Sequence, residues 1–186
     1  MDIKTYAKEH HVPIMLDEGL AFLLEYVKTN NVKNILELGT AIGYSAMNMA
    51  KIAEDIHVDT IEINEVMYNE AIKNIKEADL DKQIDVYLMD ALAFETDKQY
   101  DLIFVDAAKG KYRRYLEHFK KNSKVFIFDN LEFHGIVDDP SMTHNRNTKA
   151  LVKKIRIFRD EILNDPEYTC EYHKNIGDGV LLLKVN

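Results

Sequence analysis

The feature that most restricts the fold is an alternation of short apolar runs with longer amphipathic segments. The short runs are rich in Ile, Val and Phe, and they predict strands at residues 34–38, 57–63, 84–89, 102–106, 124–129, 167–174 and 180–185. Helical patterns are found at residues 16–28, 45–53, 65–78, 111–121 and 148–163. Continuous apolar strands alternating with helices are typical of a parallel sheet covered on both faces. We therefore predict an α/β fold with a doubly wound, seven-stranded sheet.

The last two strands differ from the others in how they are connected. Only residues 175–179, Asn-Ile-Gly-Asp-Gly, lie between them. A helical crossover between parallel strands needs a dozen or more residues, so this connection favours a hairpin. We expect a mostly parallel sheet with an antiparallel C-terminal hairpin.

Composition limits the class of protein. The chain has 186 residues, 46% of them hydrophobic, which is enough for a full core, and no linker or repeat divides it. We expect a single domain over residues 1–186. The longest apolar runs are far shorter than the ~20 residues of a membrane span, and the N-terminus lacks an apolar secretory segment. These features predict a cytoplasmic protein without a membrane partner.

Charge is distributed unevenly along this acidic chain. The formal net charge is −8, yet residues 109–124 hold seven Lys or Arg against one acid, and residues 144–159 hold six and no acid. Solvated helix faces are the common cause of such runs. Two acid-poor runs on one face would instead form a surface for a polyanion.

Each of the first five predicted strands ends in a carboxylate: Glu37, Glu62, Asp90, Asp106 and Asp129. In open α/β sheets, ligands bind beyond the carboxyl ends of the strands, near the point where strand order reverses. A single carboxylate at such a position is more often a helix cap or a turn residue. Five in succession indicate a binding site.

The segment that follows the first strand favours an adenosine ligand. Gly39 and Gly43 allow a tight turn and a close approach of backbone to ligand, and Glu62 follows Gly39 by 23 residues, where a carboxylate can hold ribose hydroxyls. The spacing is G-x-x-x-G and no P-loop lysine is present, so a pyrophosphate site is not indicated. Glu37 would repel phosphates but would suit the positive charges of S-adenosylmethionine.

Six motifs extend this interpretation over nearly the whole chain: E-L-G-T-A-I-G-Y-S, I-E-I-N, M-D-A, F-V-D-A-A-K, F-D-N and G-D-G-V. In this order they resemble the cation-dependent O-methyltransferase family that includes catechol and caffeoyl-CoA methyltransferases. Within that family the resemblance is strongest to bacterial tRNA 5-hydroxyuridine methyltransferases. The resemblance implies contacts with S-adenosylmethionine from Met15, Glu37, Gly39, Ser45, Glu62, Asp90, Ala91 and Asp106.

The resemblance also implies a metal site at Asp106, Asp129 and Asn130. Three oxygen-donating side chains without a nearby Cys fit a hard cation such as Mg²⁺. The alternative is that Asp129 and Asn130 only form a turn. Asp106 and Lys109, three residues later, are the candidate catalytic residues. Lys109 would act as a base or electrostatic partner, and the alternative is that it is a solvated lysine at a helix start.

We expect the substrate to be the 5-hydroxyl of a wobble uridine in the anticodon arm of tRNA. The alternatives are a small catechol-like molecule and a nucleotide-binding domain without catalytic activity. Residues 140–148 are polar and basic, unlike a pocket for a flat phenylpropanoid, and a homodimer is expected from the resemblance. The residues expected to contact tRNA phosphates are Lys111, Arg113, Arg114, Arg146, Lys153 and Arg156.

Overall fold

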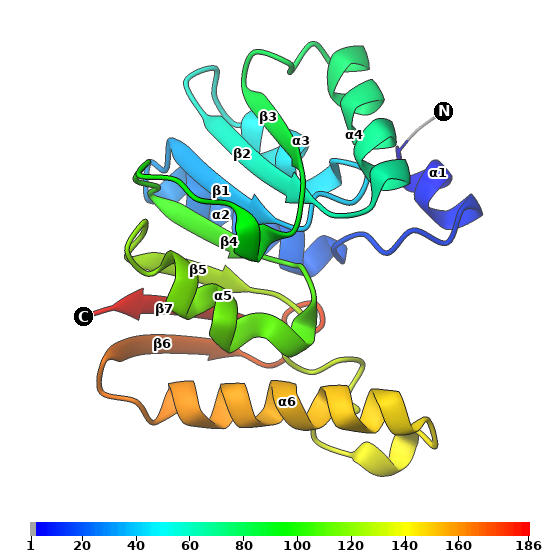
Figure 1. Ribbon diagram of the computed structural model, residues 1–186, viewed down its shortest axis with the longest axis vertical. Coiled ribbons are helices and arrows are strands. Elements are labelled where there is room, and N and C mark those ends of the chain that lie inside the picture. Colours follow the sequence, from blue (N-terminus) through cyan, green and yellow to red (C-terminus); the bar gives the residue numbers. More distant parts are fainter. Residues whose placement is uncertain (1–2) are drawn as a thin grey trace.

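The computed structural model describes residues 3–186 and contains one seven-stranded sheet. The strands run in the order β3-β2-β1-β4-β5-β7-β6 (Figure 1). Their bounds are β1 Asn34–Leu38, β2 His57–Glu62, β3 Ile84–Leu88, β4 Leu102–Val105, β5 Val125–Phe128, β6 Tyr168–His173 and β7 Val180–Val185. The first five strands are parallel and β7 is antiparallel to both of its neighbours. The predicted doubly wound sheet with an antiparallel hairpin is confirmed.

Helices cover both faces of the sheet. On one face lie α2 (Asp17–Thr29), α3 (Tyr44–Ala50) and α4 (Glu65–Glu77), and on the other lie α5 (Tyr112–Phe119) and α6 (Arg146–Leu163). In Figure 1, α5 lies in front of the strands and α6 runs alongside β6. Single turns of 3-10 helix lie at Ala91–Ala93, Lys109–Lys111 and Pro140–Met142. No helix among the described residues is long and apolar enough to span a membrane.

The alternation of side chains along the strands creates two hydrophobic layers. In β1, Ile35 packs with the α2, α3 and α4 layer, whereas Leu36 and Leu38 pack with the α5 and α6 layer. All three side chains are fully buried. Because β1 is central and covered on both sides, its apolar run is continuous rather than alternating.

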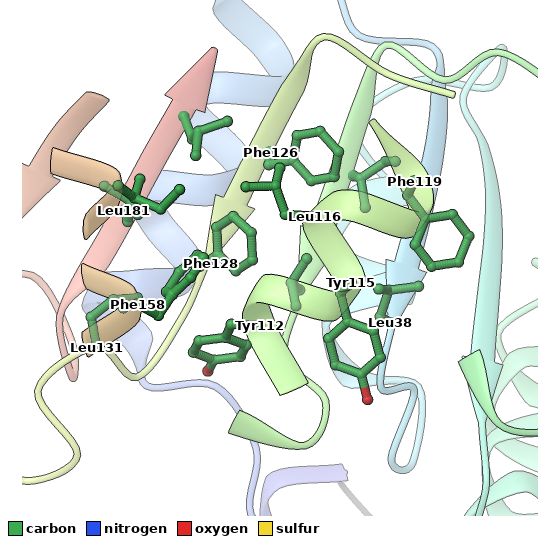
Figure 2. Close-up of a cluster of buried hydrophobic side chains, with 14 of the residues drawn as sticks. Leu38, Tyr112, Tyr115, Leu116, Phe119, Phe126, Phe128, Leu131, Phe158 and Leu181 are labelled. Atoms are coloured by element: carbon green, nitrogen blue, oxygen red, sulfur yellow. The ribbon is translucent and has the colours of Figure 1, made fainter. Parts of the chain in front are cut away.

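Three aromatic rings join α5 and α6 to the sheet (Figure 2). Tyr112, Phe128 and Phe158 pack pairwise with ring centroids 5.0 to 5.6 Å apart. The Tyr112 hydroxyl donates a hydrogen bond to the backbone carbonyl of Asp129, at 2.6 Å. The core of this face is therefore tied directly to the residue that follows β5.

Some helix bounds differ from the prediction for local reasons. The helix α6 begins at Arg146 because the Asn145 side chain accepts hydrogen bonds from the backbone N–H groups of Asn147 and Thr148, which makes Asn145 the N-cap. One helix was not predicted: α1 (Ile3–Glu9) lies in the N-terminal arm, where Ala7 and Val12 pack on Ile42.

Candidate active site

A cavity of about 650 Å³ lies at the carboxyl ends of the parallel strands, where β1 is flanked by β2 on one side and β4 on the other. This is the switch point of the sheet, at which α/β proteins bind ligands. The predicted site residues that line it are Met15, Gly39, Glu62, Asp90, Ala91, Asp106, Lys109, Lys111, Asp129 and Asn130.

Gly39 brings two strand ends close together. Its φ of +102° is rarely adopted by other residues, and a Cβ atom there would lie 2.6 Å from the carbonyl oxygen of Asp106. The first motif therefore needs glycine at this position for both conformation and space. The close approach allows Asp106, at the end of β4, to reach the cavity beside β1.

Glu62 is held in place by backbone groups. Its Oε1 accepts from the N–H groups of Ile63 and Asn64, at 2.9 and 2.8 Å, and its Oε2 accepts from the N–H of Ala41 at 2.8 Å. A carboxylate oxygen can accept two hydrogen bonds, so Oε2 keeps one acceptor position. The Glu62 carboxylate can therefore accept a hydrogen bond from a hydroxyl group of a ligand such as a ribose.

Glu37 and Ser45 were expected to contact S-adenosylmethionine, but neither lines the cavity. Glu37 is 0% exposed, and it accepts hydrogen bonds from the hydroxyls of Ser45 and Thr60, both at 2.5 Å. Side chains alternate along β1, and Leu36 and Leu38 face the α5 and α6 layer, so Glu37 faces α3 instead. Burial raises its pKa to about 8.

On the other side of the cavity, Asp90 and Ala91 follow β3. The Asp90 carboxylate accepts from the backbone N–H of Leu92 at 3.0 Å and from Nζ of Lys111 at 3.0 Å. These two contacts lower the pKa of Asp90, the backbone hydrogen bond more strongly. Asp90 is therefore an anion that already has a cationic partner.

Two carboxylates and an amide meet where β4 and β5 end. Asp129 is only 2% exposed, and burial together with the nearby Asp106 carboxylate raises its pKa above the ordinary value of an aspartate. Lys109 pairs with Asp106 through its Nζ. Asp129 has no cationic partner of its own among the described residues, so this oxygen-rich group fits a divalent cation. Asp106, Asp129 and Asn130 would hold it.

Several lining residues were not assigned a role from the sequence. The arm from Val12 to Leu16 forms one wall, Phe133 and His134 form part of another, and Asp178 lies beside them. The G-D-G-V motif was the available signal for Asp178, since it lies in the hairpin next to β5. The arm offered no comparable signal beyond Met15.

The six predicted phosphate-binding residues divide into two groups. Lys111 pairs with Asp90, Arg113 pairs with Glu161 at 2.8 Å, and Arg156 donates to the backbone carbonyl of Val137. The second group makes no ion pair with any described residue and is exposed, and it consists of Arg114, Arg146 and Lys153.

Comparisons with known proteins identify the family. The model of the O-methyltransferase family matches residues 2–185. Tapetum-specific methyltransferase 1 of Arabidopsis thaliana is 30% identical over 192 residues, which cover 98% of this chain and 82% of the relative.

Two solved structures agree with this match. A structure from Staphylococcus aureus that bears the name of a caffeoyl-CoA O-methyltransferase is 36% identical, with a TM-score of 0.94 over 99% of this chain and 90% of that one. A Bacillus cereus O-methyltransferase in complex with SAH is 26% identical, with a TM-score of 0.81 over 98% of this chain and 88% of that one. SAH is S-adenosylmethionine without its methyl group. The chain belongs to the O-methyltransferase family.

Proposed function

We propose that this protein transfers a methyl group from S-adenosylmethionine to the 5-hydroxyl of 5-hydroxyuridine at the wobble position of tRNA, with Mg²⁺ as the metal. The product would be 5-methoxyuridine. The methyltransferase part of this proposal rests on the family, and the tRNA part rests on one observation about the surface next to the cavity.

That observation is a set of exposed basic side chains on the outer face of α6. Arg146, Lys149 and Lys153 recur at helical spacing, and none of them makes an ion pair with a described residue. β6 runs parallel to β5, because each is antiparallel to β7. The helix α6 leads directly into the start of β6, so its N-terminal half lies at the cavity end of the sheet.

Contacts near the cavity support the same placement. A Cβ atom on Gly110 would lie 3.4 Å from Leu151 and 3.5 Å from Lys154, so the basic half of α6 packs beside Lys109–Lys111. Phosphates dominate the affinity of proteins for nucleic acids, and a loop base can enter a pocket without the opening of a duplex. The anticodon arm of tRNA has both backbone phosphates and unpaired loop bases.

The chemistry follows from the residues at the ends of β4 and β5. O4 and O5 of 5-hydroxyuracil are vicinal oxygens, as in a catechol, and Mg²⁺ at Asp106, Asp129 and Asn130 would lower the pKa of a hydroxyl that it binds. Lys109 is the nearest candidate to accept the hydroxyl proton. An ammonium group cannot accept a proton, so for this step Lys109 would first release its own proton to solvent and separate from Asp106. Methyl transfer then depends on the alignment of the substrate oxygen with the methyl group on the sulfonium of S-adenosylmethionine.

A second candidate is a small molecule with vicinal hydroxyls. It is favoured by the name given to the Staphylococcus aureus structure, which refers to caffeoyl-CoA O-methyltransferases. The same cavity and the same metal ligands would serve this reaction, and the basic face of α6 would then have no part in substrate binding.

One experiment separates the two substrates. The protein is incubated with S-adenosylmethionine, Mg²⁺ and either tRNA lacking 5-methoxyuridine, a simple catechol or caffeoyl-CoA, and the products are analysed by mass spectrometry. We expect 5-methoxyuridine in the tRNA digest. Methylation of a small substrate without any methylation of tRNA would reject the proposal.

The role of α6 is tested by charge reversal. Arg146→Glu combined with Lys153→Glu should weaken tRNA binding and reduce the slope of log K against log salt by roughly 0.7 to 0.9 per lost contact. Methylation of the free 5-hydroxyuridine nucleoside should stay unchanged. The matched control is Lys82→Glu, an exposed lysine just before β3, at the opposite end of the sheet. Equal losses in the two variants would mean that α6 does not bind tRNA.

A further inference from the structure

The hairpin between β6 and β7 brings a buried carboxylate to the metal ligands. Asp178 lies in this hairpin, is 6% exposed and lines the same cavity as Asp129 and Asn130. No lysine or arginine among the described residues pairs with it, and its nearest basic group is Nδ1 of the exposed His134, at 3.8 Å. A buried carboxylate without a strong cationic partner needs hydrogen-bond donors, which makes the donors around it informative.

The hairpin lies directly against the segment that follows β5. The backbone N–H groups of Leu131 and Glu132 donate to the carbonyl oxygens of Gly179 and Asp178, both at 2.9 Å. Gly179 has a φ of +85°, and a Cβ atom there would lie 2.8 Å from Cγ of Glu132. The second glycine of the G-D-G-V motif is therefore required for the approach that places Asp178.

The two carboxylate oxygens of Asp178 accept from different groups. Oδ1 accepts from the backbone N–H of His134 at 2.6 Å, and Oδ2 accepts from Nδ2 of Asn130 at 3.2 Å. Asn130 and His134 both have positive φ, at 61° and 58°, a left-handed conformation that is uncommon outside glycine but is adopted by Asn and His more often than by most other residues. Asp178 thus holds both ends of a tightly curved segment.

The bond to Asn130 also decides which atom of its carboxamide is free. The amide has one oxygen, which can bind a cation, and one NH₂ group, which cannot. A carboxylate can only accept hydrogen bonds, so the Asp178 carboxylate binds Nδ2 of Asn130. The other atom of the amide, Oδ1 of Asn130, is then free to face the cavity. The alternative orientation would place an oxygen against a carboxylate and an NH₂ group toward the cation.

We propose that Asp178 is a positioning residue for the metal site, which fixes the Asn130 carboxamide with Oδ1 toward the cation. The proposal rests on the use of a divalent cation in the proposed function. It explains the G-D-G-V motif, because the two glycines shape the hairpin and the aspartate orients a metal ligand 48 residues away in the chain.

The test measures cation binding directly, with Mn²⁺ as the probe and electron paramagnetic resonance of free Mn²⁺ as the readout. In Asp178→Asn, the new amide keeps its oxygen on the His134 N–H and turns its NH₂ group to Asn130, which reverses the Asn130 carboxamide. Partners that orient metal ligands typically change affinity by about 10–100-fold, and we expect a loss of this size. The thermal unfolding midpoint shows whether the variant is folded.

Two further variants separate orientation from charge. Glu132→Gln also removes a buried carboxylate near the loop, but this group contacts Arg159 and Tyr172 rather than Asn130, so Mn²⁺ affinity should stay near the wild-type value. The double variant combines Asp178→Asn with Asn130→Asp. In it, the amide at position 178 donates a hydrogen bond to the carboxylate at position 130, and the second oxygen of that carboxylate remains free for the cation. Affinity should recover to within a few fold.

Different failures have different meanings. If wild-type protein binds Mn²⁺ and Asp178→Asn binds it equally well, or if Glu132→Gln loses as much affinity as Asp178→Asn, the positioning role is wrong while the proposed function stands. If the double exchange recovers none of the affinity, orientation through this hydrogen bond is likewise rejected. If wild-type protein binds no Mn²⁺, the metal part of the proposed function fails as well.

Discussion

Replacement of Glu37 by Gln should stabilise the protein above pH 5. Glu37 is completely buried in β1, and its two oxygens accept from Ser45 and Thr60. Glutamine has nearly the same shape, and its amide can bond to both hydroxyls because a hydroxyl both donates and accepts. The substitution therefore removes the ability to ionise while it keeps the packing and the hydrogen bonds.

The magnitude follows from linkage. Burial raises the pKa of Glu37 from 4.5 to about 8, so between these pH values the unfolded chain has lost a proton that the folded protein retains. The unfolded state then binds fewer protons, and the free energy of unfolding falls as pH rises, by roughly 1.4 kcal/mol per pH unit. At pH 7 the loss attributable to Glu37 is about 3 kcal/mol.

The assay is urea unfolding of wild type and Glu37→Gln at pH 5, 6 and 7 without added cation. The difference in free energy of unfolding should be close to zero near pH 4.5 and should reach about 3 kcal/mol in favour of the variant at pH 7, or about 6–12 °C in the unfolding midpoint. Glu25→Gln on the exposed surface of α2 is the control and should show no such trend. A difference that does not grow with pH, or a less stable Glu37→Gln at pH 7, would refute the reasoning.

Three other substitutions test the cavity and its support. Gly39→Ala places a Cβ atom 2.6 Å from the Asp106 carbonyl oxygen, so it should lower the unfolding midpoint and reduce methyl transfer at least tenfold; an unchanged melting curve would contradict the close approach. Glu62→Ala should weaken S-adenosylmethionine binding by about 1–3 kcal/mol in calorimetry, and an equal dissociation constant would exclude Glu62 from the cofactor site. Tyr112→Phe leaves the Asp129 carbonyl without its donor, so urea unfolding should show a loss of about 1–2 kcal/mol, whereas equal stability would mean that this bond contributes little.

The strands could be predicted because each is buried on both faces of the sheet. Such a strand consists of a continuous run of apolar residues, which is visible in the local sequence. The helix α1 was not, since its seven residues are too few for a repeating helical pattern and Ala7 is its one buried side chain, with Ile3 and Tyr6 half-buried beside it. Its contact with Ile42 joins segments that are far apart in the chain, so no local pattern reveals it.

Among the site residues, too, some positions could be predicted from the local sequence and others depend on tertiary contacts. The ends of parallel strands meet at one edge, so the sequence could place Asp106 and Asp129 together. The side to which Glu37 points depends on the register of β1 and on the hydroxyls of α3 and β2 that surround it. The role of Asp178 depends on its hydrogen bond with Asn130, which lies 48 residues away in the chain. The G-D-G-V motif indicates that Asp178 is important but does not reveal this partner.

The position of β7 has a consequence for synthesis on the ribosome. β7 follows β6 in the chain but lies between β5 and β6, and β6 has no other partner strand in the described sheet. A growing chain can therefore assemble β1 to β5 early, while the open edge of β5 waits for residues 180–185. Open edges of this kind pair with other chains and lead to aggregation. Because Asp178 arrives with β7, the residue that we propose to orient Asn130 reaches its place only in the step that closes this edge.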